Sequence, residues 1–242
     1  MTDITSPGSA APRSLPARLV GVLFAPRATY AEIAARPRWL GALVVFLLLA
    51  IVPTATFMST DVGKQAWLDA AVRQQESMGR TLSDAQYQGL ERIQQFAPYI
   101  SGVSQLVFLP LATLIVSGIF LGIFNAIMGG DGTFKQVFAT VAHANVIVGL
   151  STLFTMPIAY ARQALSGATN LAVFFPFLDD NSLAARFLGA LDLFWIWWLV
   201  NLSIGLGVLY KKRTGPIATS LMVVYVIGAL VYALVRTALA GA

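Results

Sequence analysis

The stretch "WLGALVVFLLLAIVPTATFM", residues 39–58, decides the class of this protein. It contains no charged side chain. About 20 apolar residues in a helix cross the ~30 Å hydrocarbon core of a bilayer, so the stretch predicts a membrane-spanning helix. Its apolar run is about twice as long as the hydrophobic region of a signal peptide and begins only after residue 38. We therefore expect it to be a permanent span and not a cleaved leader.

The composition of the whole chain indicates the same class. Of the 242 residues, 57% are hydrophobic and 11% are charged, and the mean hydropathy is +0.73. Soluble domains have about a quarter of their residues charged, so this chain has too few charges to cover a soluble surface. The absence of cysteine excludes disulfides, thiolate metal ligands and a cysteine nucleophile. The basic residues are spread over several segments without forming a stripe, so we expect no nucleic-acid partner.

Four more segments are long and apolar enough to span a membrane: 103–128, 134–160, 187–210 and 216–239. The sequence therefore predicts an all-α, multi-pass membrane protein with five transmembrane helices. Basic residues concentrate on the cytoplasmic side of membrane proteins. "KKR" directly follows the fourth span, and Arg36 and Arg38 directly precede the first. This bias predicts a cytoplasmic N-terminus and a C-terminus outside, in the inner membrane if the protein is prokaryotic.

The segment before the first span divides into two parts. Residues 1–16 are rich in Pro, Ser and Ala and are expected to be a disordered tail. Residues 17–38 are amphipathic, with a capping-box spacing between Thr29 and Glu32. They fit an interfacial helix on the inner membrane face, and the alternative is a linker that packs on the bundle. The cations expected to contact lipid or a partner there are Arg18, Arg27, Arg36, Arg38, Lys211, Lys212 and Arg213.

The connections on the outer side are longer. Residues 59–102 are helix-prone, and Ser83 and Gln86 form a second capping box. We expect two short helices in this outer loop, with Gly79 as the hinge between them. The apolar stretch 171–178 is too short to span and contains a proline, so it is predicted to be interfacial or re-entrant.

The connection between the second and third spans is very short. It reads "GGDG" at residues 129–132. Gly129 or Gly130 can end the second span in the left-handed conformation, and Thr133 with Gln136 forms a third capping box that begins the third span. The spacing does not match a phosphate-binding loop.

Polar residues inside the spans are the candidate functional site, because such residues are costly in a bilayer and often functional. The candidates are His143, Asn145, Asp192 and Asn201. They either line an internal cavity or pair with neighbouring helices. With one histidine and no cysteine, the sequence indicates no metal site and no cofactor, and we find no signature of an enzyme.

Small and aromatic residues suggest how the helices pack. Small-xxx-small spacing predicts close helix contacts at Gly118, Gly122, Ser203 and Gly207. Tryptophans near the ends of the spans, Trp198 among them, are predicted to be interfacial anchors.

Three motifs, in order, resemble a known family. They are "LFAPRATYAEIAARPRW" (23–39), "GGDGTFKQVFATVAHANVI" (129–147) and "LDLFWIWWLVNLSIGL" (191–206). In this arrangement, which covers residues 18–239, the chain resembles the prokaryotic branch of the Yip1-domain family. The resemblance implies five membrane helices and a cytosolic N-terminus. Eukaryotic members are linked to Rab GTPases, but the sequence holds no sign of such a partner, so only the fold is carried over.

The expected function is accordingly an interaction function. The sequence predicts a non-enzymatic scaffold that organises the membrane or recruits partners through segment 17–38 and the "KKR" turn. The expected partners are other membrane proteins or further copies of the same chain in a homo-oligomer. The alternative is transport of a lipid or a small solute along the intramembrane polar residues. The two differ in whether those residues face a cavity or one another.

Overall fold

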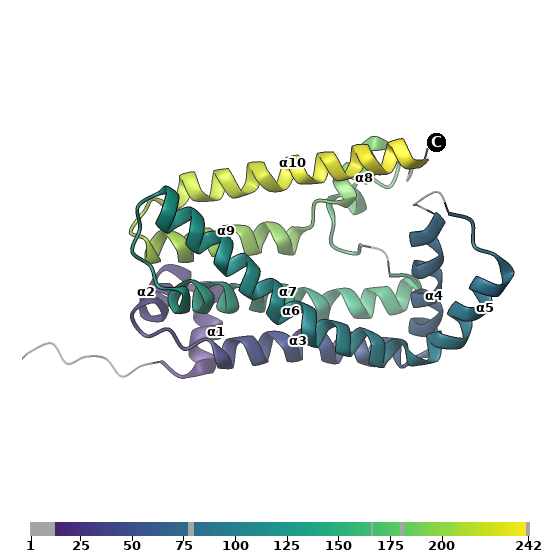
Figure 1. The fold of residues 1–242 in the computed structure, drawn as a ribbon, viewed down its shortest axis with the longest axis horizontal. Helices are drawn as coiled ribbons and strands as arrows, with labels where there is room; N and C mark the ends of the chain where they lie inside the picture. The colour runs from purple at the N-terminus through teal and green to yellow at the C-terminus, as the bar shows by residue number, and fades with distance from the viewer. Residues whose placement is uncertain (1–12, 77–79, 166, 180–181, 241–242) are drawn as a thin grey trace, which may run out of the picture.

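The computed structural model describes residues 13–76, 80–165, 167–179 and 182–240 (Figure 1). Five long helices run along the length of the molecule, and no strand is present in these ranges apart from one isolated bridge between Asn170 and Asp192. The long helices are α3 (Leu40–Met58), α6 (Ala97–Leu121), α7 (Phe134–Arg162), α9 (Leu193–Leu209) and α10 (Thr214–Ala240). The π-helix η2 (Gly122–Ile127) continues α6.

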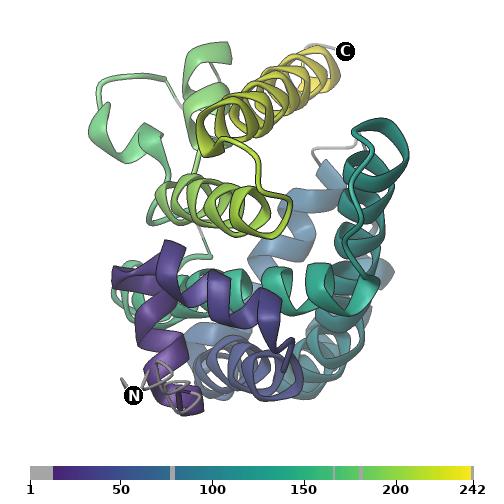
Figure 2. The same cartoon turned by 90° about the vertical axis from the view of Figure 1, so that its left-hand side faces the viewer.

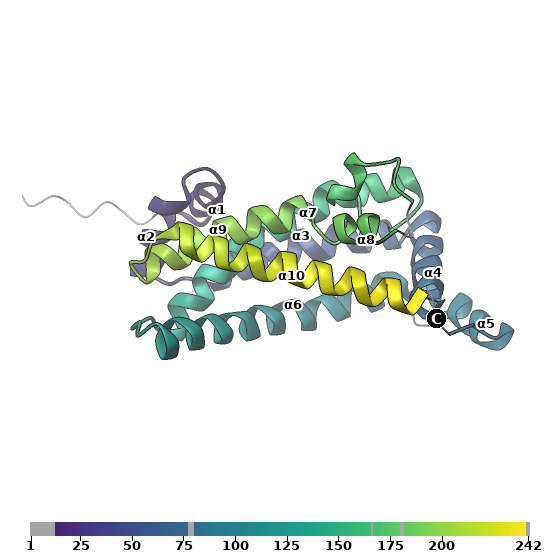
Figure 3. The ribbon, with the colours of Figure 1, turned by 90° about the horizontal axis from the view of Figure 1, so that it is seen from above.

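Short helices cluster at the two ends of the bundle (Figures 1 and 3). One end, called here the hairpin end, carries α1 (Leu15–Phe24) and α2 (Pro26–Ala35). The opposite end, the loop end, carries the C-terminal part of α10 together with the remaining short elements. These are α4 (Asp61–Glu76), α5 (Asp84–Ile93), η1 (Gln94–Phe96), η3 (Leu171–Phe174) and α8 (Leu183–Gly189).

Four stretches of helix are long and apolar enough to cross a membrane: Leu40–Met58, Asp84–Ile127, Phe134–Arg162 and Thr214–Leu239. The predicted fourth span, 187–210, is wrong at its start. Residues up to Gly189 belong to α8, and α9 begins only at Leu193. At 17 residues, α9 is shorter than the other four.

Two other predicted boundaries differ from those in the structure, at the second span and at the N-terminal tail. The predicted second span began at 103, but α6 begins at Ala97. The predicted tail, 1–16, overlaps α1, which begins at Leu15 with Ser14 as its N-cap; the rest of that tail before Arg13 lies outside the described residues, as does the predicted hinge Gly79.

The Thr29–Glu32 capping box is also wrong. Helix α2 begins at Pro26, because proline lacks the N–H that the first helical turn leaves unpaired. The Thr29 hydroxyl instead donates to the Ala25 carbonyl (3.0 Å). The other two boxes, at Ser83 and Thr133, are confirmed.

The glycine turn between η2 and α7 forms as expected. Gly129 has φ +65°, the left-handed conformation that glycine adopts without strain. A Cβ at Gly130 or Gly132 would lie within 2.6–2.8 Å of the Tyr210 ring. The turn therefore packs directly on the end of α9, which places both connections at the hairpin end.

Helix α7 is the centre of the bundle. Its first half is buried almost all round, from Val137 to Ile147. It packs against α3, α6, α9 and α2. Figure 2, viewed along the bundle, shows α9 and α10 on one side of it and α3 on the other. Gly149 allows a close approach to α3, because a Cβ there would lie 2.8 Å from the Leu49 Cβ and 3.3 Å from the Phe46 carbonyl oxygen.

Replacing Gly149 by leucine should therefore destabilise the bundle by about 1–3 kcal/mol or more, because an overpacked interface forces the helices apart. The measurement is the thermal unfolding midpoint of the detergent-purified protein. Gly118→Leu is the matched control, because a Cβ at Gly118 meets nothing within 4 Å and should leave the midpoint unchanged. Equal midpoints for the two variants would contradict the packing at Gly149.

Candidate functional site

A buried polar junction joins the N-terminal hairpin, α1 and α2, to the apolar helix α9. The Tyr30 hydroxyl donates to Asn201 Oδ1 (2.6 Å), and Asn201 Nδ2 donates to the Val22 carbonyl oxygen (2.7 Å). Tyr30 is 1% exposed and Asn201 is 2% exposed. Burial raises the pKa of the Tyr30 hydroxyl well above its usual value, so this group remains a neutral donor.

The Val22 carbonyl needs this partner for a local reason. In a continuing helix it would accept from the amide of residue 26, but Pro26 has no N–H. A carbonyl left unpaired in the interior is costly. The Asn201 amide therefore replaces the missing backbone donor at the point where α1 gives way to α2.

Two further contacts fix the hairpin on the bundle. Gln136 Nε2 donates to the Ala34 carbonyl oxygen (2.9 Å), which links the start of α7 to the end of α2. At Gly205 the helices come very close, because a Cβ there would lie 2.6 Å from the Thr140 Cγ2 and 3.0 Å from the Tyr30 Cε1. The α2–α9 contact thus depends on a glycine that the small-residue pattern did not single out.

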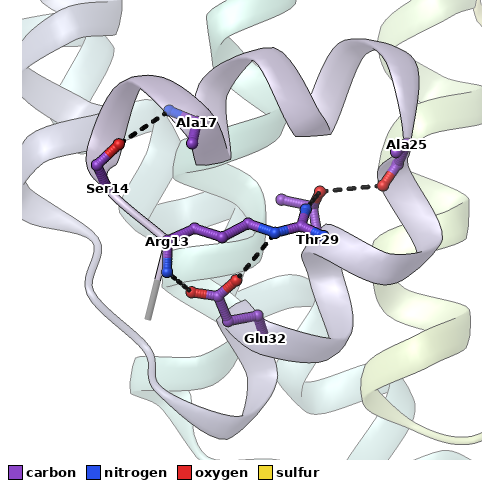
Figure 4. Close-up of polar contacts among 6 residues, drawn as sticks. All are labelled: Arg13, Ser14, Ala17, Ala25, Thr29 and Glu32. Carbon is purple, nitrogen blue, oxygen red and sulfur yellow. Dashed lines mark hydrogen bonds and ion pairs between the residues drawn. The ribbon is translucent and has the colours of Figure 1, made fainter. Parts of the chain in front are cut away.

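The two helices of the hairpin are also tied to each other (Figure 4). The Arg13 backbone N–H donates to Glu32 Oε1 (2.9 Å), and its guanidinium pairs with the same carboxylate (Nε–Oε2 3.6 Å). Arg13 Nη1 also donates to the Thr29 hydroxyl (3.1 Å). Glu32 is therefore an ion-pair partner, and it is not part of a helix cap.

The predicted interfacial segment is thus a packed hairpin with one exposed edge. Arg18 was predicted to contact lipid or a partner, but it is only 7% exposed, and its Nη1 donates to the Arg38 carbonyl oxygen (3.5 Å). Val20 and Phe24, by contrast, are 56% and 81% exposed. Most of this region therefore packs on the bundle, as the alternative interpretation of the sequence predicted. Val20 and Phe24 form an apolar edge that remains exposed.

A second buried junction joins three long helices, α6, α7 and α9, at Asn145 of α7. Its Nδ2 donates to the Thr113 hydroxyl of α6 (2.9 Å), and its Oδ1 accepts from Trp198 Nε1 of α9 (2.9 Å). Trp198 is therefore a buried hydrogen-bond donor, and the prediction of an interfacial anchor is wrong for it. A cavity of about 150 Å³ adjoins this junction, and its lining, which includes Phe46, Val116 and Val148, is mainly apolar.

His143 is fully buried in α7, two residues before Asn145 in the direction of the hairpin end. Its Nδ1 lies 2.7 Å from the Ala139 carbonyl oxygen, one turn back on the same helix. Its Nε2 has no hydrogen-bond partner among the described residues, and neither has the Nε of Arg18. Helix α1, which carries Arg18, packs against α7.

Asp192 lies outside the helix in which it was predicted. It is the N-cap of α9, and its Oδ1 accepts from the backbone N–H groups of Phe194 (2.8 Å) and Trp195 (3.3 Å). Its Oδ2 accepts from the Thr169 hydroxyl, and its own N–H donates to the Tyr225 hydroxyl (2.9 Å). These contacts are those of a helix cap at the loop end.

The four predicted polar residues therefore do not meet in one place. Asn201 pairs with the hairpin, Asn145 with α6 and α9, His143 with its own helix, and Asp192 caps α9.

The predicted small residues fall into two groups, one in close contact with neighbouring atoms and one without such contact. Ser203 is buried, and a Cβ at Gly207 would lie 3.0 Å from the Thr214 hydroxyl, whereas a Cβ at Gly118 or Gly122 meets no atom within 4 Å. Within the described part of the chain, no group of three His, Cys, Asp or Glu side chains is placed to hold a metal ion.

Comparison with known families gives one match over nearly the whole length. The family model described as Yip1 domain matches residues 20–236. The chain belongs to the Yip1 domain family. This confirms the resemblance drawn from the three sequence motifs and identifies a multi-pass membrane protein. No curated protein and no solved structure matches the chain.

In this Yip1 domain protein, Asn201→Leu should release the N-terminal hairpin. The change leaves the Tyr30 hydroxyl and the Val22 carbonyl unpaired, at about 1–3 kcal/mol for each buried group. We expect amide hydrogen exchange to accelerate in α1 and α2, with smaller changes in α3. Tyr30→Phe should have a weaker effect in the same helices, and Tyr99→Phe, at an exposed tyrosine, should have none. Unchanged exchange in Asn201→Leu would contradict the proposed junction.

Proposed function

We propose that this Yip1 domain protein is a non-enzymatic scaffold that organises the membrane or recruits partners through its hairpin end. It crosses the bilayer five times, with the hairpin end in the cytoplasm. The observation that carries the proposal is that the amides Asn145 and Asn201 are both consumed by hydrogen bonds between helices. Such pairing builds a bundle and leaves these amides unavailable to a permeating solute.

Five crossings are supported by the direction of α9. Contacts between Thr140 and Gly205 and between Asn145 and Trp198 run in opposite order along α7 and α9, so the two helices are antiparallel. A short turn then leads into α10, which returns to the loop end. The 17 residues of α9 lie at the lower end of the length that spans a bilayer.

The proposed orientation is supported by the placement of the basic residues. The hairpin end brings together segments that are far apart in the sequence and share a positive charge. They contain Arg27, Arg36, Arg38, Lys211, Lys212 and Arg213, all of which are exposed. An excess of Lys and Arg next to membrane helices is the usual mark of the cytoplasmic side.

Transport, the alternative, receives less support from the polar residues. A pathway would need side chains that converge on a hydrated cavity, but the cavity beside Asn145 is small and mainly apolar. His143 has one free ring nitrogen, and no other candidate residue is bonded to it. Asp192 serves α9 as a cap.

A proteoliposome assay tests the scaffold against the transporter. Vesicles that contain the wild-type protein should show no lipid scrambling or small-solute flux above that of protein-free vesicles. His143→Ala and Asp192→Ala should leave this background unchanged. Flux in the wild type that either substitution abolishes would overturn the scaffold proposal.

Partner recruitment tests the hairpin edge itself. Phe24→Ser removes the most exposed aromatic group of the hairpin, so partners that co-purify with the wild type after mild detergent extraction should be reduced severalfold. Phe177→Ser is the matched control, because Phe177 is similarly exposed, at 79% against 81%, and belongs to the connection between α7 and α8. Equal losses in both variants would contradict recruitment through the hairpin end.

A further inference from the structure

An open pocket of about 680 Å³ lies at the hairpin end, between the start of α2 and the connection from α9 to α10. It is separate from the two buried polar junctions. The residues that matter for its chemistry are Arg27, Gly207, Lys211, Lys212, Arg213 and Thr214. We refer to it as the basic pocket.

The basic pocket is lined by cations and by no carboxylate. Arg27 and the three consecutive residues Lys211, Lys212 and Arg213 are its only charged lining groups. All four are exposed. The ion pairs of the described residues, Arg13–Glu32 and Lys64–Asp61, involve none of them. Four positive charges therefore face one hollow without a protein counter-charge in its wall.

The backbone of the turn from α9 to α10 is held by two hydrogen bonds. Lys211 has φ +52°, the left-handed conformation that glycine usually supplies at the end of a helix. The N–H of Lys211 donates to the Val208 carbonyl (3.3 Å), and that of Lys212 donates to the Gly207 carbonyl (2.9 Å). A lysine adopts this left-handed conformation at a higher energy than a glycine does. Unlike glycine, it adds a positive charge to the pocket wall.

Arg27 is brought to the pocket from a distant part of the chain. Its Nη2 donates to the Thr214 hydroxyl (3.4 Å), across a separation of 187 residues. The docking of α2 on α9, through Tyr30 and Asn201, delivers Arg27 to this position. The pocket is thus formed by tertiary structure, and the local sequence "KKR" supplies only part of it.

The position of the pocket indicates which anion it would meet. The pocket lies where the apolar helix α9 ends and α10 begins, at the level where lipid headgroups lie if these helices span the bilayer. Guanidinium and ammonium groups are the usual ligands of phosphate. A phospholipid whose acyl chains lie beside α10 would place its phosphate in the pocket from the membrane side.

We propose that the basic pocket binds the phosphate of an anionic lipid headgroup. The proposal rests on the membrane topology of the proposed function and gives the hairpin end a lipid ligand in addition to any protein partner. The same phosphate chemistry could come from a soluble phosphate ester, and the experiment therefore includes both sources.

The test uses the full chain in lipid nanodiscs, with phosphatidylcholine as the neutral lipid and phosphatidylglycerol as the anionic probe. Binding of phosphatidylglycerol is measured by native mass spectrometry and by the thermal midpoint at increasing lipid fraction. A cation beside an anionic lipid contributes about 1 kcal/mol, a factor of about five in affinity, and we assign this factor to each cation that lines the pocket. The double variant Arg27→Gln/Lys212→Gln should therefore bind phosphatidylglycerol on the order of 25-fold more weakly.

Arg36→Gln/Arg38→Gln is the matched control. It removes the same charge from the same end of the molecule, at residues that do not line the pocket. We expect a change below about threefold at physiological salt, because neither side chain lines the pocket and salt screens exposed charges that make no direct contact with the lipid. Lys211→Gly provides a second pocket variant that preserves the turn, because glycine adopts a positive φ freely. It should weaken binding about fivefold.

Two results would overturn the proposal. Equal losses in the pocket variants and in the Arg36/Arg38 control would show general attraction to an anionic surface and no defined site. Stabilisation of the wild type by glycerol phosphate in neutral nanodiscs, to the same extent as by phosphatidylglycerol, would assign the pocket to a soluble ligand. The assay needs no partner protein and measures no flux, so its outcome is independent of the tests of the scaffold function.

Discussion

Both polar atoms of the Asn201 side chain, Oδ1 and Nδ2, form hydrogen bonds to the N-terminal hairpin. The organisation of the hairpin end depends on this contact. A polar side chain buried within a bundle must find partners, because neither lipid nor apolar side chains can replace water. Asn201 finds them in the Tyr30 hydroxyl and in the Val22 carbonyl, which Pro26 leaves without a helical donor. The hairpin is thereby fixed to the bundle and cannot lie freely on the membrane surface.

Helix α7 extends the same constraint through the rest of the bundle. Its amide at Asn145 joins α6 and α9, and Gly149 lets α3 approach closely. Each of these contacts involves a specific partner, whereas the apolar side chains around them pack without such selectivity. The polar residues therefore fix how α6, α7 and α9 are rotated about their axes relative to one another.

Docking of the hairpin also sorts the basic residues into groups with different surroundings. Arg18 is buried, Arg36 and Arg38 remain exposed, and Arg27 joins the turn 211–213 around one pocket. These residues share a chemical type and lie close to span ends in the sequence. They differ because the rigid placement of α2 on α9 gives each a different direction. A membrane surface and a protein partner would thus meet distinct groups at the same end.

The sequence by itself determined the membrane class, the positions of most long helices, the helix caps at Ser83 and Thr133, and the family, because apolar length, capping and ordered motifs are local properties. It could not place Asp192 outside α9, bury Arg18 and Trp198, or select Gly205 over Gly207 as the closest contact to α2. Only the tertiary structure decided these features. Tyr30 and Asn201 are 171 residues apart, and whether their side chains meet depends on how each helix is rotated against its neighbours, which periodicity along one chain does not encode.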